Sequence, residues 1–365
     1  MTSYKFTNCH IHLFTLDHLP PDFPIPYALE LARRPWFVKL VSMLLKCIPG
    51  QEEKGDMLER LGRTIEVGTS RSQEDVFRTL LPQYSEGTRF VVLPMDVAAG
   101  GYSEPKVSLK DQHTDLYNLT QKPIFKDLLL PFGKVHPDRP GAFDEFRRCI
   151  EDLGFHGLKL YPKLGYAPDH PLLMEKVYPY CIEHNLPVMT HCSRGGAFGK
   201  GLHRQEGQEL GAPRRYIPVL EAFPKLRVCL AHFGGDSEWD AYIKGIDPLN
   251  PKKRAENWVT SIYDMITSDK YDNLYTDISY AVFSFADNVP ALGVLLENEK
   301  LYKKVLFGSD YYMTKQEDLS ERQVSMRLRH TLGVDVFRQI STTNTQRWLT
   351  GEEPSGELDA SDAGN

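Results

Sequence analysis

The sequence lacks any long apolar run, and this absence argues against a membrane-spanning helix. Its most apolar helical stretch, Trp36 to Ile48, is interrupted by polar residues and is shorter than the roughly 20 residues that a bilayer requires. The first residues also lack the apolar segment of a secretory signal. We therefore expect a cytoplasmic protein without a membrane partner.

Cysteine is scarce, and positive charge is not in excess. The chain has six cysteines in 365 residues, and none of them form a CxxC pair. Disulfide-rich domains are usually shorter and denser in cysteine, so reduced thiols in a cytosolic enzyme are the better interpretation. Lys and Arg number 43 against 49 Asp and Glu, which gives a formal net charge of −6. Nothing in this balance indicates a nucleic-acid partner.

What the sequence does contain is a regular alternation of short β-rich runs and helical patterns. Several of the β-rich runs are apolar almost throughout, as expected of parallel strands buried on both faces. Eight strands that alternate with helices predict a (β/α)8 barrel of the TIM type. The candidate strands span residues 5–12, 89–96, 128–135, 156–161, 187–192, 226–232, 274–279 and 304–310.

One segment does not fit the alternation, and one does not fit a folded core. Residues 14–86 are too long for a single βα unit and contain helical patterns at about 27–48, 53–66 and 72–84. We interpret them as a helical insertion within a single domain of residues 1–351. It is an extra helical layer, a cap over the catalytic end or a homodimer surface. Residues 352–365 are acidic and poor in large apolar side chains, so we expect a disordered tail.

Potential metal ligands stand at the ends of four candidate strands. His10 and His12 end the first strand at i and i+2, a spacing that places both side chains on one face. His191 and His232 each end a strand and run into a glycine-containing loop, and Asp310 ends the last strand. Imidazole and carboxylate together suit zinc and similar divalent ions. Each residue alone has a structural explanation, as a hydrogen-bonded histidine or a turn aspartate, but the set favours a metal site.

Further residues suggest how a substrate is held. Lys159 lies inside an apolar strand, where a lysine is costly unless it is paired or modified. It could bind a substrate anion, be carboxylated and bridge two metals, or be structural. The loop after His191 is rich in cationic residues that suit a carboxylate-bearing substrate, or is merely solvated. The expected substrate contacts are Tyr161, Arg194, His203, Arg215 and Tyr312.

Taken together, these motifs resemble the amidohydrolase superfamily, in particular its amidohydrolase-related branch, Amidohydro_2. The matching features are the HxH of His10 and His12 and four strand motifs: "GLKLYP" with Lys159, "THC" with His191, "AHFGG" with His232 and "LFGSD" with Asp310. The order and spacing cover about 300 residues. Asn8 stands where relatives often carry Asp. The branch contains metal-dependent hydrolases and also decarboxylases.

The resemblance implies one or two divalent ions, usually zinc. The ligands would be His10, His12, His191 and Asp310, with His232 orienting water or completing a second site with Lys159. We therefore expect a hydrolase in which Asp310, His232 and Lys159 are catalytic and activated water cleaves an amide, lactone or ester. The substrate would be small and carry a carboxylate. The alternatives are a non-oxidative decarboxylase of an aromatic or unsaturated acid, and a non-catalytic barrel that acts as a binding protein.

Overall fold

The computed structural model describes residues 5–24, 34–47, 52–245, 256–281 and 285–352. Its strands are short and almost wholly buried, which agrees with the apolar runs of the sequence. They are β1 (Thr7–Ile11), β2 (Arg89–Val92), β3 (Leu129–Pro131), β4 (Gly133–Lys134), β5 (Leu158–Leu160), β6 (Val188–Ser193), β7 (Val228–Gly234), β8 (Leu274–Asp277) and β9 (Val305–Leu306).

All strand pairs are parallel, and they close into the predicted (β/α)8 barrel. The strands pair in the orders β1-β2-β3 and β4-β5-β6-β7-β8-β9. Phe132 separates β3 from β4 within one predicted strand, and its N–H bonds to the carbonyl of Val92 at 3.0 Å. The other closure joins the last strand to the first, since the Cys9 N–H bonds to the carbonyl of Phe307 at 2.9 Å. Eight strand positions therefore surround one interior.

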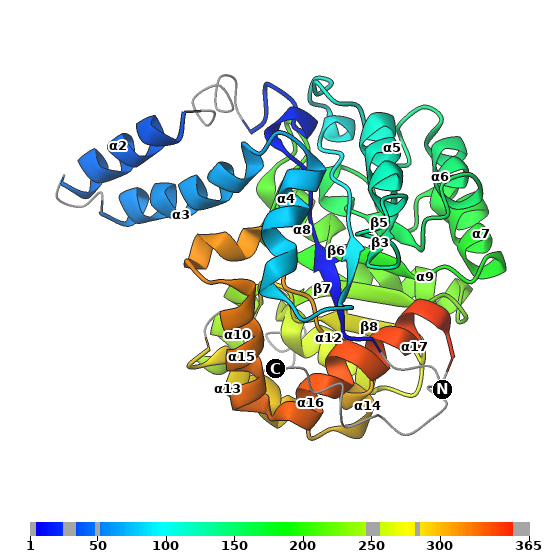
Figure 1. The fold of residues 1–365 in the computed structure, drawn as a ribbon. Helices are drawn as coiled ribbons and strands as arrows, with labels where there is room; N and C mark the ends of the chain where they lie inside the picture. Colours follow the sequence, from blue (N-terminus) through cyan, green and yellow to red (C-terminus); the bar gives the residue numbers. More distant parts are fainter. Residues whose placement is uncertain (1–4, 25–33, 48–51, 246–255, 282–284, 353–365) are drawn as a thin grey trace.

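Helices lie between successive strands and form the outer layer (Figure 1). The helical segment before β6 begins with a π-helical turn, Leu173–Val177, which leads into α7. The helices are α2 (Pro35–Lys46), α3 (Glu52–Gly68), α4 (Gln73–Leu80), α5 (Leu109–Thr120), α6 (Ala142–Glu151), α7 (Tyr178–Glu183), α8 (Arg204–Leu210), α9 (Ile217–Ala222), α10 (Asp236–Ile243), α12 (Trp258–Thr267), α13 (Asn288–Leu295), α14 (Glu299–Tyr302), α15 (Glu321–Leu332), α16 (Val334–Arg338) and α17 (Asn344–Thr350).

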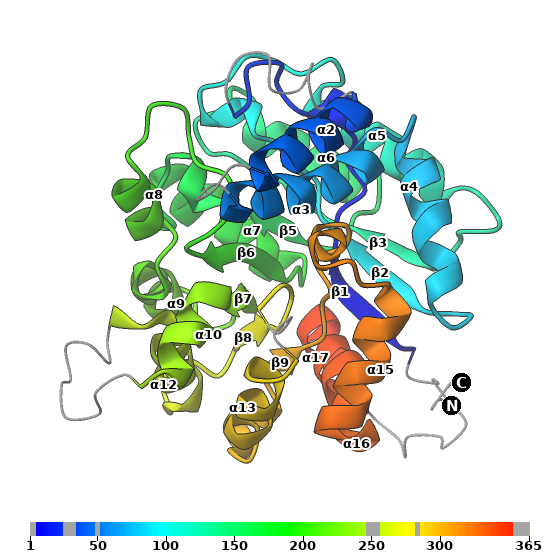
Figure 2. The same ribbon diagram turned by 90° about the vertical axis from the view of Figure 1, so that its left-hand side faces the viewer.

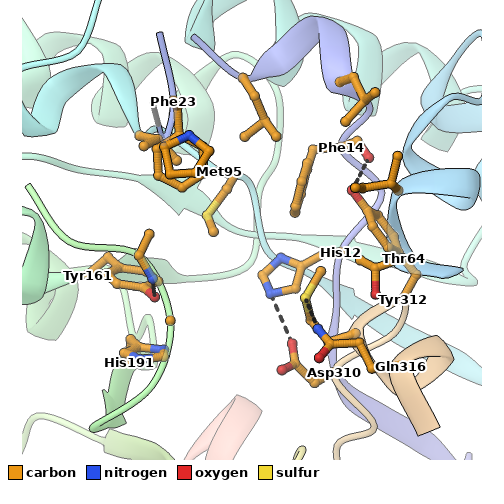
Figure 3. A pocket seen from close by; sticks show the side chains of 18 of the residues that line it. His12, Phe14, Phe23, Thr64, Met95, Tyr161, His191, Asp310, Tyr312 and Gln316 are labelled. Carbon is orange, nitrogen blue, oxygen red and sulfur yellow. Dashed lines mark hydrogen bonds and ion pairs between the residues drawn. The ribbon is translucent and has the colours of Figure 1, made fainter. Parts of the chain in front are cut away.

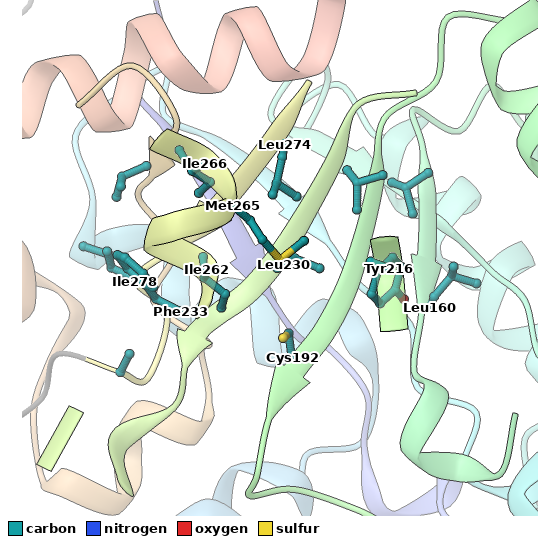
Figure 4. Packing of buried hydrophobic residues seen from close by; sticks show 14 of the residues in the cluster. Leu160, Cys192, Tyr216, Leu230, Phe233, Ile262, Met265, Ile266, Leu274 and Ile278 are labelled. Carbon is teal, nitrogen blue, oxygen red and sulfur yellow. The ribbon is translucent and has the colours of Figure 1, made fainter. Parts of the chain in front are cut away.

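Two apolar layers hold the barrel together. Inside it, Cys9, Met189 and Cys229 from different strands pack with Trp348 of α17. Between strands and helices, a larger cluster packs residues such as Leu230 against α12 (Figure 4). Alternation along each strand divides the side chains between these layers. The interior is therefore a packed core, and any site must lie at its rim.

The insertion after β1 contains a helical hairpin, which we define as α2 and α3. It stands out from the rest of the molecule in Figure 1 and lies in front of the strand ends in Figure 2. Part of the pattern predicted at 27–48 and residues 353–365 of the tail predicted at 352–365 fall outside the described residues. Among the helices that the structure does describe, none combines the length and apolarity needed to cross a membrane.

Candidate metal centre and cavity

Residues from the two ends of the chain meet at the rim of the barrel. His10 belongs to β1 and His12 follows it, whereas Asp310 follows β9. The Nε2 atoms of His10 and His12 lie 3.5 Å and 3.2 Å from Oδ1 of Asp310. All three side chains are buried. The structure thus brings together three of the four predicted ligands, and their ligand atoms lie within 4.8 Å of one another.

The hydrogen bonds made by the Nδ1 atoms of these histidines determine that their Nε2 atoms are the ones able to bind a metal ion. Nδ1 of His12 lies 2.8 Å from the carbonyl oxygen of Leu93, which can only accept, so this nitrogen carries the proton. Nδ1 of His10 lies 2.8 Å from Oδ2 of Asp277 and donates to it. In neutral rings the Nε2 lone pairs then face Asp310. Hydrogen-bonded outer nitrogens are the usual arrangement for metal-bound histidines.

This geometry leaves electron-rich atoms facing one another without a proton between them. His10 Nε2 and Asp310 Oδ1 are buried and have no hydrogen-bond partner among the described residues. Buried polar atoms are normally satisfied, so such a pair needs an explanation. A divalent cation between the two imidazoles and the carboxylate removes the repulsion and supplies the missing partner. The residues therefore fit a metal ion.

The electrostatics keep the ligands in the forms that bind metal. Burial lowers the pKa of His10 to about 3, and burial also lowers that of His191 well below its usual value. Both rings are therefore neutral at pH 7. Burial alone would raise the pKa of Asp310, but the neighbouring imidazoles of His12, His10 and His232 outweigh it and keep the pKa below its usual value. Asp310 is therefore an anion.

His191 and His232 form a pair beside the three ligands. Nε2 of His191 donates to the carbonyl of Gly195 at 3.0 Å, and Nδ1 of His232 donates to the carbonyl of Ser279 at 3.0 Å. In neutral rings, Nδ1 of His191 and Nε2 of His232 then carry no proton, and these two atoms lie 3.0 Å apart. Nδ1 of His232 lies 3.9 Å from Oδ2 of Asp310. The fourth predicted ligand, His191, thus lies beside His232 at the edge of the group, and binding of an ion by His191 stays a prediction.

The backbone at these strand ends is strained. His232 and Asp310 have φ angles of +70° and +58°, in the left-handed region that non-glycine residues rarely adopt. Each such residue costs on the order of 1–3 kcal/mol and persists where surrounding contacts fix it, commonly at functional sites. The strain turns both side chains toward the rim, where they meet.

Lys159 lies below this group with its side chain buried. Burial lowers its pKa to about 8, and the carboxylates of Asp277 and Asp310 oppose that effect. It lines the cavity described below. A lysine at this place is available as a cation close to the reacting groups, and the chemical state of its amine stays a prediction.

Asn8 links the first strand to the loop that carries Asp310. Its Nδ2 donates to Ser309 Oγ at 2.8 Å, and its Oδ1 accepts from the backbone N–H groups of Ser309 and His10 at 3.1 and 3.2 Å. An amide can both donate and accept in this way, whereas a carboxylate could not donate. The residue that departs from the family pattern therefore positions two of the three ligands.

Two positioning residues were not predicted from the sequence. Asp277 accepts from His10 Nδ1 and also from the backbone N–H of His232 at 2.9 Å. Lys163 is buried and donates to three carbonyls of the loop after β6, those of Ser193, Arg194 and Gly195. Gly195 is the residue whose carbonyl holds His191. A charged residue at the end of an apolar strand was a signal available for Asp277; Lys163 offered none.

The group opens into a cavity of about 630 Å³ (Figure 3). Its floor, defined as His12, Lys159, His191, His232 and Asp310, carries the polar groups. Tyr161 stacks on His191 with ring centres 4.1 Å apart. The other walls come from the loop after β1, from the hairpin and from the segment after Asp310. Enclosure of this kind is typical of small-molecule sites.

The predicted substrate contacts divide into two groups. Tyr161 and Tyr312 line the cavity, whereas Arg194, His203 and Arg215 are not among its lining residues. Arg194 forms an ion pair with Glu238 and lies over the ring of Trp258. Arg215 pairs with Glu209, and His203 stands at the N-cap position of α8 without a side-chain cap hydrogen bond. The two arginines therefore form ion pairs outside the cavity, and substrate contact by Arg194, His203 and Arg215 stays a prediction.

Two other groups of potential ligands occur in the described residues, and both are already bonded. His10, His232 and Asp277 share the hydrogen bonds given above. His113, Glu145 and Cys149 lie between α5 and α6, where His113 Nδ1 donates to Glu145 at 2.7 Å and Arg148 also binds this carboxylate. Unlike the group at Asp310, these polar atoms are satisfied.

Fold and site together define a class: a closed parallel barrel with a histidine–aspartate centre at the carboxyl ends of its strands. Comparison with known proteins agrees. The family model Amidohydro_2, described as amidohydrolase, matches residues 89–350. The chain belongs to this family.

Similarity to individual proteins is limited. A 2-keto-4-carboxy-3-hexenedioate hydratase of Sphingobium sp. is 30% identical over 109 residues, which cover 27% of this chain and 31% of the hydratase. The match thus spans under a third of that relative. In fold, the chain resembles a 5-carboxyvanillate decarboxylase of Sphingomonas paucimobilis (15% identity, TM-score 0.54, 95% and 99% of the two chains). It also resembles a probable 2-pyrone-4,6-dicarboxylic acid hydrolase of Acinetobacter baumannii (14%, TM-score 0.51, 95% and 100%).

Proposed function

We propose that this chain is a metal-dependent hydrolase that holds one divalent ion, zinc by preference, at His10, His12 and Asp310 and cleaves an ester, lactone or amide. The observation that carries the proposal is the meeting of two imidazole nitrogens and a carboxylate oxygen, without a proton between them, at a buried site. A divalent ion bound there would acidify water and polarise a carbonyl group.

The roles of the protein groups follow from their positions. Asp310 is anionic, and its Oδ2 faces His232, so it is placed to take a proton from water and return it to the leaving group. His232, whose Nδ1 donates to the carbonyl of Ser279, would orient the attacking water through Nε2. Lys159, as a cation at the floor, would stabilise the negative charge that develops on the substrate oxygen.

A second candidate reaction uses the same water in another way. The partial similarity to a hydratase favours addition of water to a carbon–carbon double bond, and the fold is shared with a decarboxylase. A non-catalytic barrel is the third alternative. It has no need of a stoichiometric ion, so the metal content of the purified protein separates it from the other two.

The test is turnover in ¹⁸O-labelled water with zinc-loaded protein. A panel of lactones, aryl esters and anilides is compared with unsaturated and aromatic acids. Hydrolysis places one ¹⁸O in a new carboxylate, hydration places it in a new hydroxyl group, and decarboxylation releases carbon dioxide. Consistent release of carbon dioxide, or hydration without cleavage, would contradict the proposal.

A further inference from the structure

The upper walls of the cavity are apolar, in contrast to its floor. Two residues after β1 and four from the hairpin illustrate this: Phe14, Leu16, Val38, Val41, Leu58 and Ile65. Figure 3 shows Phe14, Phe23 and Met95 facing the space above His12. Most of the 630 Å³ is therefore bounded by carbon.

Charge within the cavity is confined to its floor. Among the lining residues that the structure describes, Lys159 is the one lysine or arginine. The polar lining residues above the floor are uncharged, and they include Thr64 and Gln316. The cavity can therefore match one anionic group of a substrate, next to the metal ligands, and offers no cation for a second.

Two arginines of the hairpin bind the segment that follows Asp310. Arg63 donates to the carbonyl of Gln316 at 2.9 Å and to Glu59 at 3.2 Å, and Arg60 pairs with Glu317. Gln316 and Glu317 belong to the 3₁₀ helix Met313–Glu317, which follows Asp310. These contacts hold the hairpin against the catalytic loop, so its apolar side chains stay over the floor.

We propose, on the basis of the proposed function, that the substrate has one anionic or carbonyl head and a large alkyl or aryl body. The head lies at Asp310 and Lys159, and the body lies under the hairpin. Each buried methylene contributes favourably to binding. A second carboxylate placed against the apolar walls of the cavity would lose its hydration without gaining a hydrogen bond or an ion pair. The names of the relatives describe compounds with several carboxylates, so the inference separates this chain from them.

The experiment uses hydroxamates, which bind divalent metals without being turned over, and isothermal titration calorimetry of the zinc-loaded protein. The series is aceto-, butano-, hexano- and octanohydroxamate, together with the octanedioic monohydroxamate that keeps a free terminal carboxylate. We expect affinity to rise about fourfold with each methylene. The terminal carboxylate should weaken octanohydroxamate binding at least tenfold.

A matched pair of variants locates the effect. Val41 lines the cavity, whereas its neighbour Leu40 on α2 is 39% exposed and does not. Val41→Asp should abolish the dependence on chain length, and Leu40→Asp should preserve it. The circular-dichroism melting temperature of each variant reports whether the hairpin change disturbs the fold.

The outcomes separate the two proposals. Equal affinity across the series, or tighter binding of the carboxylate-ended probe, would overturn the substrate class while the metal function stands. If no hydroxamate binds and the protein retains no zinc, the proposed function fails and the substrate class fails with it. A strong rise of hydroxamate affinity with chain length that is lost in Val41→Asp would support both the substrate class and the proposed function.

Discussion

The floor and the hairpin face the same cavity, yet they are built by different means. The floor collects single side chains from strand ends that lie up to about 300 residues apart, and hydrogen bonds fix their orientation. The hairpin supplies neighbouring side chains from one insertion, held by apolar contacts and by ion pairs at its rim. The barrel therefore supplies the polar groups of the cavity, and the insertion supplies its apolar walls. Changes to the two regions should therefore have separable effects.

The largest effect should come from Asp310→Asn, which keeps the size of the side chain and removes its charge. We expect turnover to fall by roughly 10³-fold or more, because the variant loses both a metal ligand and the proton acceptor. Metal analysis should show less than one equivalent of zinc. Asp335→Asn, an exposed carboxylate paired with Arg338, is the matched control. Full activity of the zinc-loaded Asp310 variant would contradict the assignment.

A smaller effect is expected from Asp277→Asn. The amide cannot accept from His10 Nδ1 with the strength of the carboxylate, so the imidazole becomes a weaker ligand. Loss of such an outer partner typically reduces metal affinity 10- to 100-fold. Competition with a fluorescent zinc chelator measures the change. An unchanged affinity would show that Asp277 has only a structural role.

Lys163→Met tests whether the floor depends on the loop after β6. Loss of the donor to three carbonyls should let Gly195, and with it His191, move, and we expect activity to fall about tenfold at unchanged zinc content. Lys244→Met, which removes an exposed lysine paired with Asp240, is the control. If the Lys163 variant instead retained full activity, positioning by this lysine would be refuted.

The smallest effect concerns acid stability. Burial, with a contribution from Lys134, lowers the pKa of His136 to about 4 from 6.5. The unfolded chain therefore takes up this proton first as pH falls, and the native state loses up to about 3 kcal/mol between pH 6.5 and 4. Above pH 6.5 the group contributes no pH dependence. Urea denaturation at pH 7 and pH 4.5 should show a smaller loss for His136→Phe than for the wild type.

The control for this measurement is His330→Phe, which removes an exposed histidine. Its stability should decline between the two pH values as in the wild type. A His136 variant that loses as much stability as the wild type would rule out His136 as a source of the acid sensitivity.

The sequence was most informative about the floor. The meeting of His12, His232 and Asp310 in the floor, and of His10 beside it, could be predicted because each stands at the end of an apolar run, and parallel strands bring such ends together. The fold followed from the same alternation, although most observed strands are shorter than predicted, β6 and β7 extend past their predicted ends, and Phe132 divides one strand in two.

The sequence was least informative about contacts between side chains that are distant along the chain. Arg194 and Arg215 suggested a carboxylate site, but Glu238 and Glu209 bind them, and neither pairing has a sequence signal. The left-handed backbone at His232 and the clamp made by Lys163 also depend on tertiary contacts. Whether the insertion packs over the strand ends could not be decided from its helical period alone.

The most direct test of the central claim is an anomalous difference map of crystals of the zinc-loaded protein. The account predicts one strong peak bonded to Nε2 of His10, Nε2 of His12 and a carboxylate oxygen of Asp310. A peak at His113, Glu145 and Cys149 instead, or the absence of any peak at Asp310, would contradict it.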